Sequence, residues 1–150
     1  TLLGGGGGDL LLGGAGSDFM HGGEGQDTLD GGADFDWVEY RYDSLNIVVT
    51  LNGSTNATVT IGGVAEDTIR NIEGLLSGSG NDLLVGDGLG NVFYGENGDD
   101  TISGAGGADG LNGGFGNDVL TGGLAADNLD GGDGIDIASY AEKTLSLIHI

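Results

Sequence analysis

The amino-acid sequence predicts an all-β solenoid built from short strands and glycine-rich turns. A nine-residue unit, Gly-Gly-x-Gly-x-Asp-x-U-x with U a large apolar residue, recurs eleven times. The apolar residues are in phase with it, since ten of the eleven U positions hold a large apolar side chain. Glycine makes up 36 of the 150 residues, and most of it lies inside these units. A fixed period of this kind is typical of stacked repeat architectures.

Each unit is expected to contribute one turn and one very short strand. The apolar eighth residue and its two neighbours predict a strand with one inward side chain. The six residues before them contain two to five glycines, which allow the positive φ angles of a tight turn. Two units should form one coil of a flattened solenoid. The turns would then stack in two rows, with alternate units in the same row.

The units fall into two blocks, and we expect a roll in each. The first block covers residues 4–39 and the second covers residues 77–139. Residues 40–76 break the period and predict a capping or linking insert, because repeat solenoids need atypical caps. Residues 140–150 are predicted to begin a second, truncated insert. Their last six residues, 145–150, are expected to be a non-native tail.

The insert is expected to contain a β-hairpin. Residues 47–51 and 57–61 are rich in β-branched residues, and the polar stretch between them suggests a turn. Residues 66–76 lead back into the repeats and are expected to hold a helical turn.

Composition narrows the possible functions. The net charge of −21 argues against nucleic acid and anionic membranes as partners, and it suits a protein whose counter-ions are bound metal cations. Without cysteine, disulfides and thiolate metal sites are impossible. No apolar run reaches the roughly 20 residues of a membrane-spanning helix. HExxH, G-x-S-x-G and Walker A motifs are missing, so the region is expected to be non-catalytic, although a longer parent protein could be an enzyme.

The sixth position of the unit carries the chemistry. Ca²⁺ prefers six to eight oxygen ligands from carboxylates and backbone carbonyls. Glycine turns expose carbonyls, and an aspartate at the end of each turn adds a short charged ligand that a neighbouring coil can share. A purely conformational role in an Asx turn is the alternative. The predicted metal ligands are the aspartates at ten of the eleven sixth positions: Asp9, Asp18, Asp27, Asp36, Asp82, Asp100, Asp109, Asp118, Asp127 and Asp136.

Departures from the pattern predict strong and weak sites. In one row of the second block the fourth residue is always glycine and the sixth always aspartate, which predicts sites at the pairs Asp82/Asp100, Asp100/Asp118 and Asp118/Asp136. In the opposite row, Leu89 and Ala125 replace the fourth glycine, where a side chain at positive φ would be strained. That row also has Asn91 at a sixth position, so Asn91/Asp109 and Asp109/Asp127 should be weaker. In the first block, Asp9/Asp27 is complete, whereas Asp34 at a fourth position puts Asp18/Asp36 in doubt.

The repeat resembles the RTX (repeats-in-toxin) family of calcium-binding proteins. The best copies are GGEGQDTLD at residues 22–30 and GGFGNDVLT at residues 113–121. The stretches WVEYRYDSLNIVVTL and DTIRNIEGLLSGSGNDLLVG are similar to segments between RTX blocks of secreted bacterial proteins. This resemblance implies a right-handed parallel β-roll, Ca²⁺ bound in the turns, and transient contact with a type I secretion machinery.

The expected function is therefore calcium binding that makes folding dependent on Ca²⁺ in a secreted extracellular or cell-surface protein. One alternative is a calcium-rigidified stalk of an RTX adhesin or surface protein. Another is a C-terminal secretion and folding module of a secreted metalloprotease, lipase or cytolysin.

Overall fold

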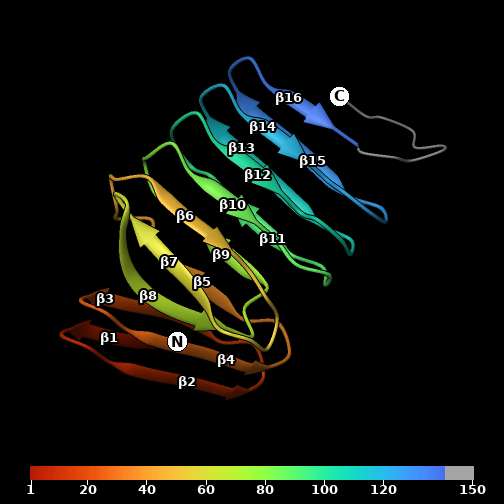
Figure 1. The fold of residues 1–150 in the computed structure, drawn as a ribbon. Coiled ribbons are helices and arrows are strands. Elements are labelled where there is room, and N and C mark those ends of the chain that lie inside the picture. Colours follow the sequence, from red (N-terminus) through yellow and green to blue (C-terminus); the bar gives the residue numbers. More distant parts are fainter. Residues whose placement is uncertain (141–150) are drawn as a thin grey trace.

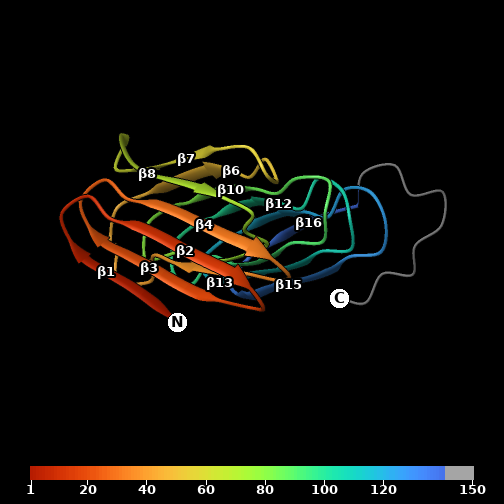
Figure 2. The same cartoon turned by 90° about the horizontal axis from the view of Figure 1, so that it is seen from below.

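The computed structural model describes residues 1–140, and in this range the chain forms strands and turns without any helix. No segment of these residues is therefore a helix long and apolar enough to cross a membrane. The strands form two sheets that face each other (Figures 1 and 2). The prediction of an all-β parallel roll is confirmed.

The first sheet has seven strands, all parallel to their neighbours. In spatial order they are β1 (Leu2–Gly6), β3 (Phe19–Glu24), β5 (Trp37–Glu39), β9 (Gly74–Leu76), β11 (Val92–Tyr94), β13 (Gly110–Phe115) and β15 (Asn128–Asp133).

The second sheet has nine strands and is parallel except around β7. In spatial order they are β16 (Ile137–Ser139), β14 (Val119–Thr121), β12 (Thr101–Ser103), β10 (Leu83–Val85), β6 (Ile47–Thr50), β7 (Ala57–Ile61), β8 (Val64–Arg70), β4 (Thr28–Ala33) and β2 (Leu10–Ala15).

The strand register confirms the predicted coil. Leu11 pairs with Leu29 and Ile102 pairs with Leu120, so strands from alternate units lie side by side. Within each repeat block, consecutive strands alternate between the two sheets, and each turn therefore stacks on the turn one coil away. We call the turns that lead into the first sheet row 1 and those that lead into the second sheet row 2.

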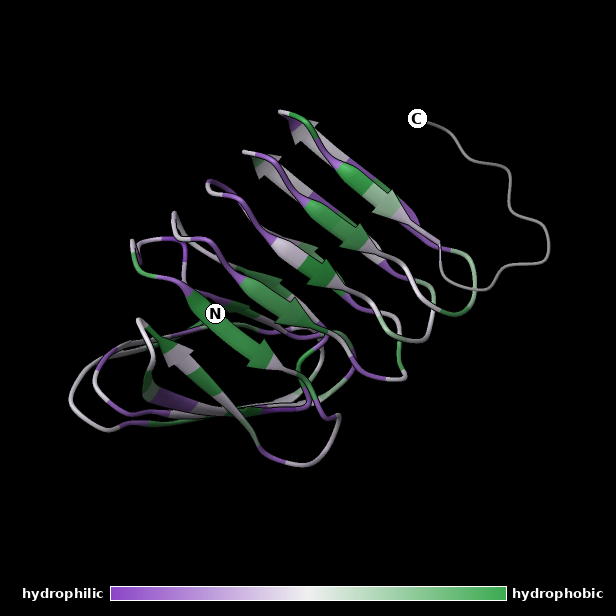
Figure 3. Cartoon of the chain, turned by 45° about the horizontal axis from the view of Figure 1, so that its top comes forward, coloured by the Kyte–Doolittle hydropathy of each residue, from purple (hydrophilic) through white to green (hydrophobic). Residues whose placement is uncertain are grey.

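A thin apolar core runs between the sheets. The eighth residues supply much of it, and Met20, Leu84 and Phe93 are fully buried. Apolar residues lie mainly in the strands, while the turns are largely polar or neutral (Figure 3). The core thins at the last described coil, where Leu129 is half-buried and Ala138 is exposed.

The insert contributes strands to both sheets and contains the predicted hairpin. Strands β6 and β7 pair antiparallel, with Ile47 opposite Ile61, and β8 continues this antiparallel sheet. Its outer strands pair parallel with the repeats, β8 with β4 and β6 with β10. Strand β9 lies between β5 and β11 in the first sheet. Both sheets thus run through the insert, and the two blocks form one stack.

The helical turn expected over residues 66–76 is wrong. Most of that segment belongs to β8 and β9, which a three-residue turn at 71–73 connects. The expectation of a truncated insert with a non-native tail concerns residues 140–150, which lie outside the described residues except for Tyr140.

Candidate metal sites in the stacked turns

The sixth-position aspartates of row 2 form a ladder of hydrogen bonds between coils. The backbone N–H of Asp82 donates to Asp100 Oδ1 at 2.7 Å, and that of Asp100 donates to Asp118 Oδ1 at 2.8 Å. The Asp118 N–H donates to Asp136 Oδ1 at 3.0 Å. Each carboxylate therefore leans towards the turn of the preceding coil, and the three predicted pairs of this row are brought together.

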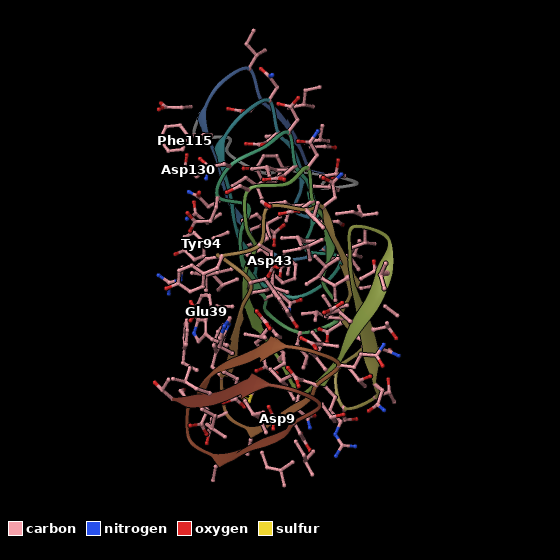
Figure 4. The ribbon with its side chains drawn as sticks, turned by 90° about the vertical axis from the view of Figure 1, so that its left-hand side faces the viewer. Asp9, Glu39, Asp43, Tyr94, Phe115 and Asp130 are labelled. Carbon is pink, nitrogen blue, oxygen red and sulfur yellow. The ribbon has the colours of Figure 1, made fainter. Side chains whose placement is uncertain are left out.

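The first block repeats this arrangement in both rows. The Asp9 N–H donates to Asp27 Oδ1 at 2.8 Å in row 2, and the Asp18 N–H donates to Asp36 Oδ1 at 2.7 Å in row 1. Asp9 lies between the ribbons of the first coils, whereas Tyr94, Phe115 and Asp130 project along one side of the roll (Figure 4). The pair Asp9/Asp27 of the first block therefore lies in row 2, the same row as the ladder from Asp82 to Asp136 in the second block.

Row 1 of the second block has the same ladder. The Asn91 N–H donates to Asp109 Oδ1 at 2.8 Å, and the Asp109 N–H donates to Asp127 Oδ1 at 3.2 Å. With these contacts, all ten predicted aspartates occupy equivalent places in the stacked turns.

The second carboxylate oxygen is what points to a ligand. Asp100 is 1% exposed and Asp118 is fully buried, yet neither Oδ2 atom has a hydrogen-bond partner. A buried charged oxygen without a partner is costly, so native proteins pair such atoms or place them on a metal. The same holds for Oδ2 of four further aspartates in the two rows: Asp9, Asp27, Asp36 and Asp82.

Ten of the eleven units open with a glycine, which leaves room for this oxygen. A Cβ on Gly95 would collide with Asp100 Oδ2 and would lie 2.5 Å from the carbonyl oxygen of Gly113 in the next coil. At Gly113 the same two kinds of atom meet, Asp118 Oδ2 and the carbonyl oxygen of Gly131. A carboxylate oxygen and a carbonyl oxygen therefore converge in these two turns. These are the ligand types that Ca²⁺ prefers.

Burial also disfavours the charged carboxylates when no cation is present. It raises the pKa of Asp100 from 3.8 to about 8, against the opposing effect of the hydrogen bond from the Asp82 backbone. Burial likewise raises the pKa of Asp82 and of Asp118. A bound cation would stabilise the ionised form, because an opposite charge at short distance favours it.

Backbone oxygens would be needed to complete a coordination shell. Among residues 1–140, no three side chains of His, Cys, Asp or Glu converge on one point that could hold a metal. A single carboxylate per turn matches a site that also draws on the carbonyls of glycine turns. The residues present fit Ca²⁺, which accepts such mixed oxygen shells.

The fourth positions behave only partly as predicted. Asp34 and Ala125 adopt φ of 78° and 74°, the strained region expected for a side chain there. The prediction of strain at Leu89 is wrong, because Leu89 avoids positive φ. The turn that contains Leu89 has hydrogen bonds within itself instead. The Leu89 N–H donates to Asp87 Oδ1, and the Asp87 N–H donates to Asn91 Oδ1. The relative strength of the two rows stays a prediction.

The structure adds Asp67, which sequence reasoning missed. The Asp27 N–H donates to Asp67 Oδ1 at 2.9 Å, so Asp67 takes the next place in the row 2 ladder. The Tyr40 hydroxyl donates to Asp67 Oδ2 at 2.9 Å, and burial raises the pKa of both groups. Both oxygens of Asp67 are thus bonded within the protein. The signal was the sequence Asp67-Thr68-Ile69, which repeats residues 100–102.

Glu73 was missed as well. The Asp36 N–H donates to Glu73 Oε2 at 3.0 Å, so Glu73 follows Asp36 in the row 1 ladder. No unit of the nine-residue pattern surrounds Glu73, and only the apolar pair Leu75-Leu76 after it resembles a repeat.

Comparison with known proteins agrees with this geometry. The family model of the RTX calcium-binding nonapeptide repeat (4 copies) matches residues 3–38, 76–111 and 111–138, more than half of the chain. No curated protein matches the chain. The matched segments contain nearly all the stacked turns described above. The chain belongs to the family of proteins with RTX calcium-binding nonapeptide repeats.

Proposed function

We propose that this chain binds Ca²⁺ in its stacked turns and depends on the ion to fold. One observation carries the proposal: buried carboxylate oxygens in both rows, such as Oδ2 of Asp36 and of Asp118, have no hydrogen-bond partner. Such a set of oxygens disfavours folding unless a cation compensates it. The thin apolar core offsets little of this cost, since a fully buried leucine contributes only about 2 kcal/mol to the stability of the folded state.

The proposed ligands are the aspartates of the two ladders, together with backbone carbonyls of the glycine turns. The strongest sites are proposed for the pairs Asp82/Asp100, Asp100/Asp118 and Asp118/Asp136. When bound, Ca²⁺ supplies positive charge and holds neighbouring turns together. Because the sites do not exist in the unfolded chain, the free energy of binding becomes free energy of folding.

This linkage suits a secreted protein. Extracellular Ca²⁺ modules typically bind with Kd of roughly 10⁻⁴ to 10⁻³ M. The chain would stay unfolded where Ca²⁺ is scarce, pass a type I secretion machinery, and fold outside the cell or at its surface. The membership in a family whose repeats are typical of secreted bacterial proteins supports this route. The region itself is proposed to be non-catalytic.

One alternative has support from the fold. Both sheets run through the insert, so the two blocks form one stack with a shared core. A continuous stack of this kind would serve as a calcium-rigidified stalk in an adhesin or surface protein, without any role in delivering an enzyme.

The decisive experiment is far-UV circular dichroism of the full chain in EDTA and in millimolar Ca²⁺. We expect a disordered spectrum in EDTA and a β spectrum with Ca²⁺, and isothermal titration calorimetry should count several bound ions. Mg²⁺ at the same concentration serves as the control for ionic strength and should not induce the β spectrum. An identical β spectrum in EDTA would refute Ca²⁺-dependent folding.

A further inference from the structure

The insert rebuilds part of a repeat turn in row 1. Strand β8 pairs with β4, with Arg70 opposite Asp30, and β9 pairs with β5, with Gly74 opposite Trp37. Between these paired positions, the six residues 31–36 therefore stack on the three residues 71–73. Although this second turn lacks the nonapeptide pattern, it occupies the place of the next coil.

The carbonyl of Asn71 occupies the position that a glycine carbonyl has in a true repeat. A Cβ on Gly31 would collide with this oxygen and would lie 2.5 Å from Asp36 Oδ2. Gly95 has the same surroundings, with Asp100 Oδ2 and the carbonyl oxygen of the following coil. Asn71 adopts φ of 51°, a conformation that asparagine tolerates better than most residues.

Row 2 meets the insert in a different way. At Gly22, the three atoms nearest to a Cβ all belong to Asp27. There the next carboxylate, Asp67, is bonded to the Tyr40 hydroxyl. In row 2 the insert thus closes the ladder with a hydroxyl, whereas in row 1 it places a carbonyl oxygen beside an unpartnered carboxylate oxygen.

Asp36 and Glu73 supply the charge at this position. Asp36 is fully buried, and its Oδ2, beside the Asn71 carbonyl, has no hydrogen-bond partner. Glu73 is half-buried, and its Oε2 accepts the Asp36 N–H at 3.0 Å. Glutamate is one methylene longer than aspartate, which suits a segment that has three residues fewer between its paired positions than the segment at 31–36.

We propose that Asp36, the Asn71 carbonyl and Glu73 form a further Ca²⁺ site, to which the non-repeat insert contributes two of the three named ligands. The site rests on the proposed Ca²⁺ binding by the repeats and extends the row 1 ladder into the insert. It makes docking of the insert on the first block dependent on Ca²⁺. The competing explanation is that no ion binds here and that Glu73 serves only as the hydrogen-bond acceptor of the Asp36 N–H.

Glu73→Gln separates these explanations, because glutamine still accepts the N–H but carries no charge. Tb³⁺ is a suitable probe, since it replaces Ca²⁺ in oxygen sites and emits when a nearby tryptophan is excited. Trp37 is the only tryptophan of the chain, directly follows Asp36, and lies against Gly74. The exposed Glu24, in a row 2 turn, provides the matched control Glu24→Gln.

For Glu73→Gln we expect one fewer bound ion in calorimetry with Ca²⁺ and weaker tryptophan-sensitised Tb³⁺ emission. Glu24→Gln should match the unchanged chain in both measurements. If either the ion count or the emission of Glu73→Gln equals that of the unchanged chain, the site does not exist. Absence of any ion binding by the unchanged chain would instead refute the proposed function.

A second variant covers the case in which Glu73→Gln does not fold at saturating Ca²⁺. Glu73→Asp keeps the charge on a shorter side chain. We expect it to restore the β spectrum and the bound ion at a higher Ca²⁺ concentration. If Glu73→Asp also stays unfolded, Glu73 has a purely structural role and the proposed site is wrong.

Discussion

Replacing Asp118 by asparagine tests the carboxylate ladder most directly. The Asp118 side chain accepts the Asp100 N–H at 2.8 Å, and its own N–H donates to Asp136 Oδ1. Asparagine retains the acceptor at Oδ1, so the backbone contact between coils survives. What it removes is the charge on a fully buried group whose Oδ2 has no partner. Any loss of stability at high Ca²⁺ then reports on ion binding.

The expected loss follows from the two proposed sites that share Asp118. A site with Ca²⁺ at 100 times its Kd stabilises the folded state by about 2.7 kcal/mol. Losing both sites should lower the free energy of unfolding by about 5 kcal/mol under such conditions. With an m value of about 2 kcal/mol/M, the urea midpoint should fall by roughly 2 to 3 M.

The assay is urea unfolding monitored by far-UV circular dichroism in saturating Ca²⁺, with calorimetric ion counts alongside. The matched control is Asp127→Asn in row 1, where the ladder hydrogen bond is longer, at 3.2 Å, and the side chain is half-buried. Its midpoint should fall by much less. Equal losses of bound Ca²⁺ in the two variants would show that the ranking of the rows is wrong. An unchanged midpoint in Asp118→Asn would refute the two proposed Ca²⁺ sites that share Asp118.

Three further results are expected. Gly95→Ala should abolish one or more Ca²⁺ sites in calorimetry, because its Cβ would displace Asp100 Oδ2, whereas Gly88→Ala should bind normally, since no atom lies within 4 Å of a Cβ there. Tyr40→Phe should cost about 1 to 3 kcal/mol in urea unfolding at saturating Ca²⁺, because it leaves a buried oxygen of Asp67 without its donor. In EDTA, acidification should promote the β spectrum. The pKa of the Asp100 carboxyl is about 8 in the folded chain and 3.8 ordinarily. Protonation of Asp100 therefore stabilises the folded state fully below pH 3.8, and this stabilisation is lost as the pH rises through about 8. A β signal independent of pH in EDTA would contradict that linkage.

The repeats could be predicted from the sequence because every unit carries the same information. A glycine for the turn, an aspartate at its end and an apolar eighth residue fix the coil, the two rows and the core together. The pairs Asp82/Asp100 and Asp100/Asp118 follow from that period alone. Their contacts with the neighbouring N–H groups are those expected of stacked turns.

The insert could not be predicted to the same depth, because its spacing is ambiguous. Ile69, Ile72 and Leu75 are spaced three residues apart, as on a helix, and all three are buried. In the structure this spacing has another cause: Ile69 points inward from β8, Ile72 lies in the short turn, and Leu75 points inward from β9. A period of three residues does not distinguish these two arrangements.

The ladder residues of the insert escaped prediction for a related reason. Asp67 and Glu73 stand 40 and 37 residues after the aspartates that they follow in the ladders. The repeats use an interval of 18 residues, as between Asp9 and Asp27. Only the pairing of β8 with β4 and of β9 with β5 reveals their positions, and that pairing depends on tertiary contacts.

The unequal strand numbers of the two sheets have a consequence for the shape of a longer protein. Between β4 and β10 the second sheet holds three strands of the insert, where a repeat would contribute one. Two extra strands lengthen that side by about 10 Å, at roughly 4.8 Å per strand, while the first sheet gains nothing. The axis of the stack must therefore turn towards the first sheet at the insert, and the blocks diverge in direction on either side of it (Figure 1). In a chain with several such inserts, the number of coils between them would set the radius of an arc.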